Sequence, residues 1–559
     1  MPADAEGAAP AAALAVEALT VALPPGADRP FAVREGSLRL ARGEILCVVG
    51  ESGSGKSVMA MAVMRLLAPG LRVQSGRVLL AGADLLAMAE EEMRRVRGRR
   101  VAMVFQEPMT ALNPLMTVGA QLAETWRTHT DLSAAEIRAR SLEALREVAL
   151  PDPEGALCAY PHELSGGQRQ RAMIATALAL EPEVLICDEP TTALDVTTQA
   201  QVLSLIRDLQ RRRGTAVLFI THDFGVVAEI ADRVAVMQRG ELVEEGPVSR
   251  VLTAPAHDYT RRLLAAVPPL RAPPSRRPDA AGEAVLEVRG LTKTYRAAGL
   301  FRRRRATRAL DDVSVTLKRG ATLGVVGESG SGKSTLARCV VGLLAPDGGE
   351  IRIAGAPLPR ARAEAAKLVQ MVFQDPYASL NPRRRAGEQV AQGPVAAGAP
   401  RAEAMARARG LFELVGLDPA AVSRFPHEFS GGQRQRIGIA RALAMRPRVL
   451  VADEPVSALD VSVQAQVLEL LRGLRARFGL STLFITHDLR VAAQVCDEVA
   501  VMRDGAVVEA GPVAEVFATP RHAYTRALLA AVPGREAPGL GEGPSAPAAP
   551  PAGAPTACE

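Results

Sequence analysis

The sequence is poor in several residue types, and each shortage excludes a class of protein. Aromatic residues make up 3% of the 559 residues, and no uninterrupted apolar run reaches the roughly 18 residues that cross a membrane. No basic start followed by an apolar stretch opens the chain, so we expect no export signal and a cytosolic protein. The six cysteines are scattered without a C-x-x-C pair, which argues against a zinc site and a disulfide framework.

Lysine is also rare, although the chain carries 67 basic residues. Only five lysines occur, and two of them, Lys56 and Lys333, stand in the same local sequence. Such reuse of a rare residue indicates that both positions need an ammonium group. The net charge of +6 permits an anionic partner but does not require nucleic acid. A hydrophobic content of 48% with 23% charged residues is typical of a globular protein.

Long segments of the sequence occur twice. GESGSGKS stands at 50–57 and 327–334, MVFQ at 103–106 and 371–374, SGGQRQR at 165–171 and 430–436, and LFITHD at 218–223 and 483–488. The offset between copies falls from 277 to 268 and then stays at 265 from SGGQ onward. The repeat is therefore a whole duplicated domain, with length differences confined to earlier loops.

Short apolar runs precede the repeated motifs and predict the fold class. EILCVVG and TLGVVG end in the glycine loops, VLICDE and VLVADE end in paired acids, and AVLFITH and STLFITH end in histidine. Such runs are typical of buried parallel strands with functional groups at their carboxyl ends. We expect an α/β fold with a phosphate-loop core in each copy.

The motif G-x-x-x-x-G-K-S after a strand predicts a phosphate site. Its glycines let backbone N–H groups turn toward phosphates, and the following helix presents its positive end to them. We expect Lys56 and Lys333 to reach the β- and γ-phosphates, and Ser57 and Ser334 to bind Mg²⁺. A plain glycine-rich turn is the alternative, but the strand context and the duplication argue against it.

The residues after two further strands predict hydrolysis. Asp188 and Asp453 are expected to hold Mg²⁺ through water, and Glu189 and Glu454 to polarise the attacking water. We expect the two histidines to contact the γ-phosphate and water, and the two glutamines to complete the Mg²⁺ shell: His222, His487, Gln106 and Gln374. The plainer interpretations are buried structural histidines and surface amides.

The SGGQ motif predicts a second anion site at the start of a helix in each copy. With it, about 500 residues of the chain resemble a tandem ABC ATPase. In that family, the SGGQ of one nucleotide-binding domain closes over the ATP of the other. The resemblance implies one site from Lys56, Glu189 and Ser430, and another from Lys333, Glu454 and Ser165. Asp195 and Asp460 match the D-loop that runs between the sites.

The resemblance also implies the full set of ATP-binding residues. In the glycine loops these are Gly50, Glu51, Ser52, Gly53, Ser54, Gly55, Lys56 and Ser57, and Gly327, Glu328, Ser329, Gly330, Ser331, Gly332, Lys333, Ser334 and Thr335. In the SGGQ motifs they are Ser165, Gly166, Gly167 and Gln168, and Ser430, Gly431, Gly432 and Gln433. Tyr295 stands where the family stacks an aromatic ring on adenine, whereas the aligned residue of the first copy is Leu23. We therefore expect the first site to bind ATP more weakly, and both sites to hydrolyse it.

A further repeated element, PAHDYTRRLLAAVP and PRHAYTRALLAAVP, resembles the C-terminal motif of the oligopeptide/dipeptide importer ATPases. Its polar markers are His257, Tyr259, His522 and Tyr524. The resemblance implies two integral-membrane permease subunits as partners, contacted around 106–126 and 374–393, and an extracytoplasmic binding protein. A soluble ribosome factor is the alternative, but it would need a long charged linker. A DNA-repair ATPase would need zinc cysteines and large insertions.

The same resemblance and the composition give the expected boundaries. We expect disorder at 1–13, ATPase domains at 14–254 and 285–519, importer elements at 255–270 and 520–533, a linker at 271–284 and a disordered tail at 534–559. The transported solute is not encoded here, because selectivity belongs to the permease and the binding protein. Peptide, glutathione, nickel chelate and opine all remain open.

Overall fold

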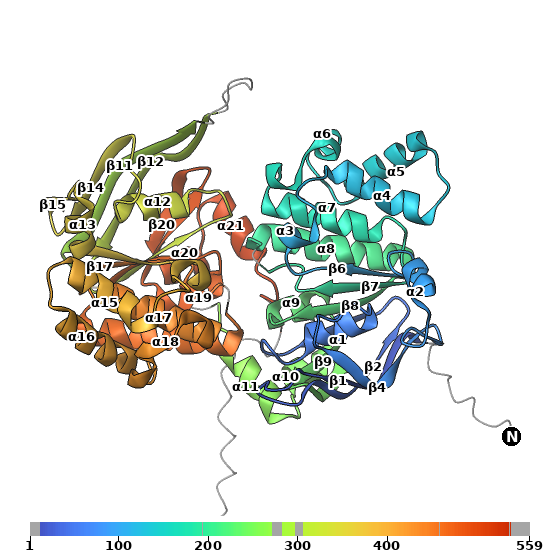
Figure 1. Ribbon diagram of the computed structural model, residues 1–559. Helices are drawn as coiled ribbons and strands as arrows, with labels where there is room; N and C mark the ends of the chain where they lie inside the picture. Colours follow the sequence, from blue (N-terminus) through green and yellow to red (C-terminus); the bar gives the residue numbers. More distant parts are fainter. Residues whose placement is uncertain are drawn as a thin grey trace, which may run out of the picture.

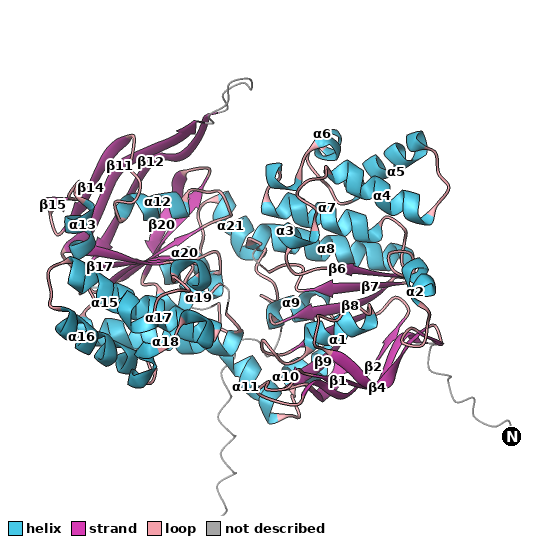
Figure 2. Ribbon diagram, viewed as in Figure 1, coloured by secondary structure: helices cyan, strands magenta, loops and turns pink. Residues whose placement is uncertain are grey.

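The computed structural model describes residues 12–192, 194–270, 282–296, 306–457, 459–535 and 537. Its two halves lie side by side and have the same architecture, which confirms the expected α/β fold in each copy (Figure 1). Each half contains an antiparallel sheet, a mainly parallel core sheet and a layer of helices (Figure 2). No helix in the described part of the chain is long and apolar enough to cross a membrane.

The core sheet of each half places its strands in the order that the motifs require. In the first half the order is β10-β9-β3-β8-β7-β6, and the second half repeats it as β20-β19-β13-β18-β17-β16. All neighbours are parallel except the antiparallel edge strand, β10 or β20. The strands are β3 Ile45–Val49, β6 Val101–Val104, β7 Val184–Asp188, β8 Ala216–Thr221, β9 Arg233–Gln238, β10 Glu241–Pro247, β13 Thr322–Val326, β16 Val369–Val372, β17 Val449–Asp453, β18 Ser481–Ile485, β19 Glu498–Arg503 and β20 Ala506–Pro512.

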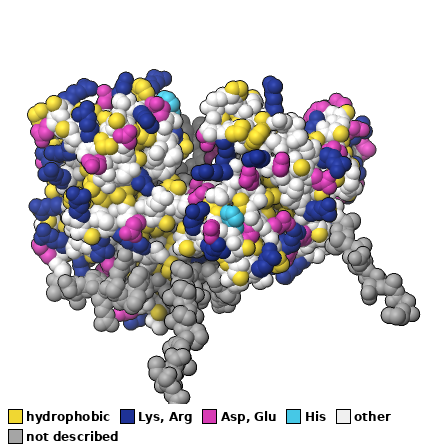
Figure 3. All heavy atoms as spheres, turned by 90° about the horizontal axis from the view of Figure 1, so that it is seen from below, with side chains coloured by type: hydrophobic (Ala, Val, Ile, Leu, Met, Phe, Trp, Pro, Cys, Tyr) yellow, Lys and Arg dark blue, Asp and Glu magenta, His cyan; other side chains and the backbone are white. Residues whose placement is uncertain are grey.

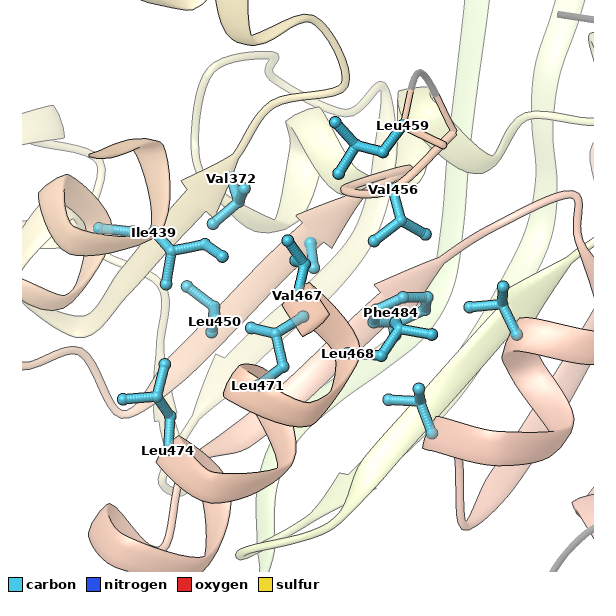
Figure 4. Packing of buried hydrophobic residues seen from close by; sticks show 14 of the residues in the cluster. Val372, Ile439, Leu450, Val456, Leu459, Val467, Leu468, Leu471, Leu474 and Phe484 are labelled. Carbon is cyan, nitrogen blue, oxygen red and sulfur yellow. The ribbon is translucent and has the colours of Figure 1, made fainter. Parts of the chain in front are cut away.

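Helices on one face and the antiparallel sheet with one helix on the other bury the central strands of each core sheet. Every residue of β3, β7, β8, β13, β17 and β18 is buried. Figure 4 shows Leu468 and Leu471 of α18 packed with Phe484 of β18 in the core of the second half. The core helices are α1 Lys56–Val63, α2 Glu90–Val96, α8 Val196–Arg213, α9 Phe224–Ile230, α10 Val248–Thr253, α12 Lys333–Val340, α13 Arg362–Leu368, α18 Val461–Phe478, α19 Leu489–Val495 and α20 Val513–Ala518.

A second, antiparallel sheet and a helical layer complete each half. The antiparallel sheets are ordered β2-β1-β4-β5 and β12-β11-β14-β15. Their strands are β1 Ala12–Ala22, β2 Phe31–Ala41, β4 Arg72–Leu80, β5 Ala83–Asp84, β11 Ala284–Arg296, β12 Ala306–Lys318, β14 Gly348–Ile353 and β15 Ala356–Pro357. The helical layers are α3 Pro108–Ala111, α4 Val118–His129, α5 Ala134–Glu147, α6 Pro153–Cys158, α7 Gly166–Leu178, α14 Pro376–Ser379, α15 Ala386–Ala396, α16 Arg401–Leu414 and α17 Gly431–Leu443.

Some expected boundaries need correction. Ala12 and Ala13 belong to β1, and Ala284 begins β11, so the expected disordered start and the linker are each too long. Ordered structure extends there because Ala12 pairs with Ala41 of β2 and Ala284 pairs with Lys318 of β12. Apart from Gly534, Arg535 and Ala537, the expected disordered tail lies outside the described residues, as do 1–11 and 271–281.

The importer elements form short helices that lie where the halves meet. They are α11 Asp258–Ala266 and α21 Ala523–Ala530, and α11 contacts α18 of the second half (Figure 1). The buried guanidinium of Arg490 donates to the carbonyl oxygens of Pro268 (3.4 Å) and Pro533 (2.8 Å), which follow these two helices. One side chain of the second half therefore joins both importer elements.

Candidate active sites

The glycine loop of each half folds around its own lysine. In the first half, the Lys56 ammonium donates to the carbonyl oxygens of Gly50 (2.6 Å) and Glu51 (2.9 Å) and contacts Ser54 Oγ at 3.4 Å. Lys333 makes the matching contacts in the second half, to residues 327, 328 and 331. Burial lowers the pKa of both lysines, against the charges of nearby acids such as Glu189 and Glu454.

Close packing explains why glycines occupy these loops. Gly50 has φ 155°, and a Cβ there would lie 2.2 Å from the carbonyl oxygen of Met237. Gly55, with φ 106°, precedes α1 directly, and a Cβ there would lie 2.4 Å from the carbonyl oxygen of Ala32. The loop therefore presses its backbone against β9 of the core sheet and β2 of the antiparallel sheet, and it presents the N–H groups at the start of α1 to a ligand.

The paired acids at the ends of β7 and β17 have opposite electrostatic environments. Burial is the largest cause and raises the pKa of Asp188 to about 6. The 2.9 Å hydrogen bond from Ser57 Oγ acts in the opposite direction and lowers this pKa. Burial also acts on Glu189, but the hydrogen bond and charge of His222, with the charge of Lys56, bring its pKa down to about 2. The second half repeats both directions at Asp453 and Glu454.

The expected histidines and glutamines converge on the glutamates. His222 Nδ1 lies 3.3 Å from Glu189 Oε1, while Gln106 Nε2 donates to Glu189 Oε2 at 3.0 Å. In the second half, His487 Nδ1 lies 3.2 Å from Glu454 Oε1, and Gln374 Nε2 donates to Glu454 Oε2 at 2.7 Å. The structure therefore brings together the strand, histidine and glutamine motifs of each half.

Both glutamates have a strained backbone. Glu189 and Glu454 each have φ 46°, in the left-handed region that costs a non-glycine residue about 1–2 kcal/mol. Thr192 Oγ1 also donates to Glu189 Oε2 at 3.0 Å, a contact that the sequence analysis missed. Strain of this kind is typical of positions that orient a reacting group, and here it fixes a charged carboxylate.

The residues around each site suit a magnesium nucleotide by their donor chemistry. Ser57 Oγ and Asp188 Oδ1 are 2.9 Å apart, and Ser334 Oγ and Asp453 Oδ1 are 3.3 Å apart. Hydroxyl and carboxylate oxygens are the ligands that Mg²⁺ prefers, next to a phosphate. Each serine ends its glycine loop and each aspartate ends β7 or β17, so the fold brings the paired oxygens to the place where a phosphate-bound cation would lie.

The SGGQ motifs open α7 and α17 with reciprocal caps. Ser165 Oγ accepts from Gln168 N at 3.3 Å, and Gln168 Oε1 accepts from Ser165 N at 2.9 Å. Gly167 is required by packing, because a Cβ would lie 2.7 Å from Thr198 Cγ2 of α8. The second half repeats the cap with Ser430 and Gln433. Serine and glutamine therefore shape the helix end on which an anion site depends.

The D-loop aspartates lie where the two halves meet, and they act differently. Asp460 Oδ1 accepts from the backbone N–H of Ser52 at 2.8 Å, and Ser462 Oγ donates to Glu51. Asp195 Oδ1 instead accepts from Thr198 N of its own helix at 2.9 Å. The second half thus contacts the first glycine loop directly, which the sequence repeat alone does not indicate.

The importer-element tyrosines contact the glycine loops. The Tyr259 hydroxyl accepts from Glu51 N at 3.1 Å and lies 3.2 Å from Glu51 Oε2. In the second half, the Tyr524 hydroxyl accepts from Glu328 N at 3.0 Å. Both tyrosines are buried. Both tyrosines stand in repeated sequence elements, which indicated that they matter. The repetition did not indicate that their hydroxyls contact the glycine loops.

Tyr295 is placed differently from the other expected site residues. It lies near the end of β11 with 42% of its surface exposed, whereas Leu23 follows β1 and is half-buried. An exposed ring offers a free face, and the leucine of the first half does not. The expected asymmetry in nucleotide binding stays a prediction.

Comparisons with known proteins show which proteins the chain is similar to. A family model described as "ABC transporter" matches residues 33–192 and 310–457, and one described as "Oligopeptide/dipeptide transporter, C-terminal region" matches 243–296 and 508–558. The chain is 49% identical to the peptidoglycan transport ATP-binding protein YejF of Agrobacterium fabrum, over 93% of this chain and 96% of the relative. It is also 49% identical to the glutathione import ATP-binding protein GsiA of Escherichia coli O157:H7, over 93% of this chain and 89% of the relative.

Proposed function

The chain belongs to the ABC transporter family and carries its ATPase domain twice, and from this premise we propose that it powers the uptake of peptides or related small solutes. The repeated C-terminal element supports import, because its family model is described as an oligopeptide/dipeptide transporter region. Relatives named for peptidoglycan transport and glutathione import support a solute of this class. The ribosome-factor alternative finds no support among them.

We propose that each half supplies part of both ATP sites. The contact of Asp460 with Ser52 supports this arrangement, because it reaches from the second half into the first glycine loop. Val196, which follows Asp195, also packs in the hydrophobic core of the second half. Ser430 would complete the site of Lys56 and Glu189, and Ser165 that of Lys333 and Glu454.

The residues of each site have separate tasks in hydrolysis. Lys56 and the N–H groups at the start of α1 would bind the phosphates, and Ser57 and Asp188 would hold Mg²⁺, which would neutralise phosphate charge. Glu189 stays charged at neutral pH and orients the attacking water, while His222 and Gln106 fix its two carboxylate oxygens. The second half repeats these tasks.

We place the chain on the cytoplasmic face of the inner membrane, docked on two permease subunits. Large apolar side chains are exposed within both proposed docking segments: Leu115 is 85% exposed and Tyr377 is 63% exposed. On the face in Figure 3, Lys and Arg are spread among Asp and Glu over both halves. That mixture favours a local apolar contact with a protein over a broad electrostatic contact with a nucleic acid.

Purification from solubilised membranes tests the transport function. We expect the tagged chain to retain two multi-span proteins, and the variant with Leu115→Glu and Tyr377→Glu to lose most of both, because buried charge opposes an apolar contact. Leu66→Glu, at a residue that is 42% exposed outside these segments, should retain them. Recovery with ribosomes and without membrane proteins would contradict the proposal.

The base-stacking difference predicts unequal nucleotide affinity. Tyr295→Ala should weaken ATP binding to the second half by about fivefold to a hundredfold, because stacking is worth about 1–3 kcal/mol per base. Leu23→Tyr should strengthen binding to the first half. Titration of each site in chains whose other glycine-loop lysine is replaced by alanine would measure both affinities. Equal affinities of the two wild-type sites would refute the hypothesis.

A further inference from the structure

The two halves differ sharply at one matched position, where the helical layer meets the amino-terminal edge of the core sheet. In the first half, this junction is closed by ion pairs. Arg213, at the end of α8, pairs with Glu147 at the end of α5 (2.9 Å) and with Glu181 (3.6 Å). Arg100 pairs with Glu183 at 2.6 Å. Each of the two arginines is therefore paired with at least one of the three glutamates, and the space between them is small.

The second half replaces every member of this network. The correspondence is fixed by the fold, because Arg213 and Phe478 each precede the left-handed glycine that ends the matching long helix, at positions 214 and 479. The remaining replacements follow from the aligned strands β6 and β16, β7 and β17, and helices α5 and α16: Arg100 to Leu368, Glu147 to Leu414, Glu181 to Arg446, and Glu183 to Arg448. Three acids are lost, and two of them become arginines.

A cavity results from these replacements. The first half holds a space of about 230 Å³ lined by Glu147, Glu181 and Arg213, whereas the second holds about 890 Å³ at the matching position. The larger volume lies within the range of about 300–1,000 Å³ that small-molecule sites have. It lies beside the first residues of β17 and β18, while the catalytic acid follows the last residue of β17. The cavity is thus separate from the ATP site.

The walls of the cavity are apolar and its charge is positive. Leucine side chains line it together with Phe478, which is 54% exposed. Four arginines also line it, Arg319, Arg407, Arg446 and Arg448, against a single acid, Glu283. Arg407 is bound to Glu403 and to a carbonyl oxygen, but the other three guanidinium groups have no ion pair or hydrogen bond within the described residues.

We propose that this cavity binds a small anionic amphiphile, with its carboxylate or phosphate on the arginines and its apolar body against the leucines and Phe478. Unpaired guanidinium groups match the two oxygens of such a head group in a fork geometry. The exposed phenylalanine and the leucines gain burial from the apolar body. A purely ionic ligand would leave Phe478 uncovered, and a purely apolar ligand would leave the arginines unpaired. The proposal does not depend on which solute is transported.

Calorimetric titration of the full chain with decanoate, decanol and inorganic phosphate tests this site. We expect saturable 1:1 binding of decanoate, and weaker binding of decanol, which lacks the charge, and of phosphate, which lacks the apolar body. The variant with Leu414→Glu, Arg446→Glu and Phe478→Arg restores the first half's residues. It should bind decanoate about tenfold or more weakly, since charged hydrogen bonds contribute about 1.5–3 kcal/mol.

Two controls separate a lost site from a damaged protein. Arg360→Glu changes an exposed arginine of the same half that does not line the cavity, and it should leave decanoate affinity unchanged. If the triple variant fails to fold, the milder double variant Arg446→Gln and Arg448→Gln takes its place, and it should also weaken decanoate binding. ATP binding by each variant shows whether that variant is folded. Absence of saturable decanoate binding, equal affinity in the variants, or equally tight binding of decanol or phosphate would overturn the proposal.

Discussion

Replacing Glu189 and Glu454 with glutamine in one chain is expected to lower ATP hydrolysis by about 100-fold or more, because loss of a positioned base costs about 10²–10⁴ in rate. Glutamine keeps the shape but removes the charge that His222 and Lys56 hold in place. ATP binding should survive, since the glycine loops are unchanged. We therefore expect a chain that retains ATP through gel filtration and releases almost no phosphate.

Matched variants decide whether the effect belongs to the catalytic carboxylates. Glu91→Gln changes a side chain that is 82% exposed, and it should hydrolyse ATP at the unmodified rate. Each single variant, Glu189→Gln or Glu454→Gln, should retain ATP mainly in its own half. Undiminished phosphate release by the double variant would show that another group orients the attacking water.

Replacing Ser165 with arginine is expected to abolish hydrolysis at the site that contains Lys333, and to leave hydrolysis at the site of Lys56. The serine caps α7, and a long charged side chain there would block the helix end that we assign to the opposite nucleotide. Ser430→Arg should have the reverse effect. The loss of hydrolysis should be nearly complete at the affected site, because the two halves cannot close over the nucleotide when the helix end is blocked.

Vanadate trapping of an azido-ATP analogue, followed by peptide mapping, reads the two sites separately. Trapping requires turnover, so the label marks the half whose glycine loop still hydrolyses ATP. With Ser165→Arg the label should remain at residues 50–57 and disappear from 327–334. Arg360→Glu should label both halves as the unmodified chain does. Loss of label only at residues 50–57 would contradict the head-to-tail arrangement.

The repeated motifs predicted the fold and most of the site because each carries its own local physics. A buried strand that ends at Asp188 and is followed by Glu189 places two carboxylates at one sheet edge wherever it occurs. The glycine loop likewise requires only its strand and helix. Individual contacts between the halves could not be read from spacing, and the resemblance implied only that the D-loop of Asp460 runs between the two sites. The hydrogen bond between Asp460 and Ser52 joins residues of different halves, and no spacing within one copy encodes it.

The structural consequences of the sequence differences between the two copies could not be predicted from the sequence either. Repeats draw attention to what is shared, so the exchange of Glu181 for Arg446 carried no signal until the structure placed both in matching cavities. The tyrosines of the importer elements were recognised as markers, but only the folded chain shows that Tyr259 touches Glu51. The expected linker was too long because an Ala-rich segment can pair as a strand when a partner edge is available.

Arg490 shows what joining the two halves in one chain makes possible. The matching residue of the first half is Gly225, where a Cβ would lie 2.7 Å from the carbonyl oxygen of Pro533. In a symmetric homodimer, both copies would have to carry the same residue. Two arginines would bring like charges together beside this carbonyl, and two glycines would leave both carbonyls without a donor. Because the two halves are fused, Arg490 can occur in one half only and still contact both importer elements. Two identical subunits could not make this asymmetric contact, so the two halves are not interchangeable.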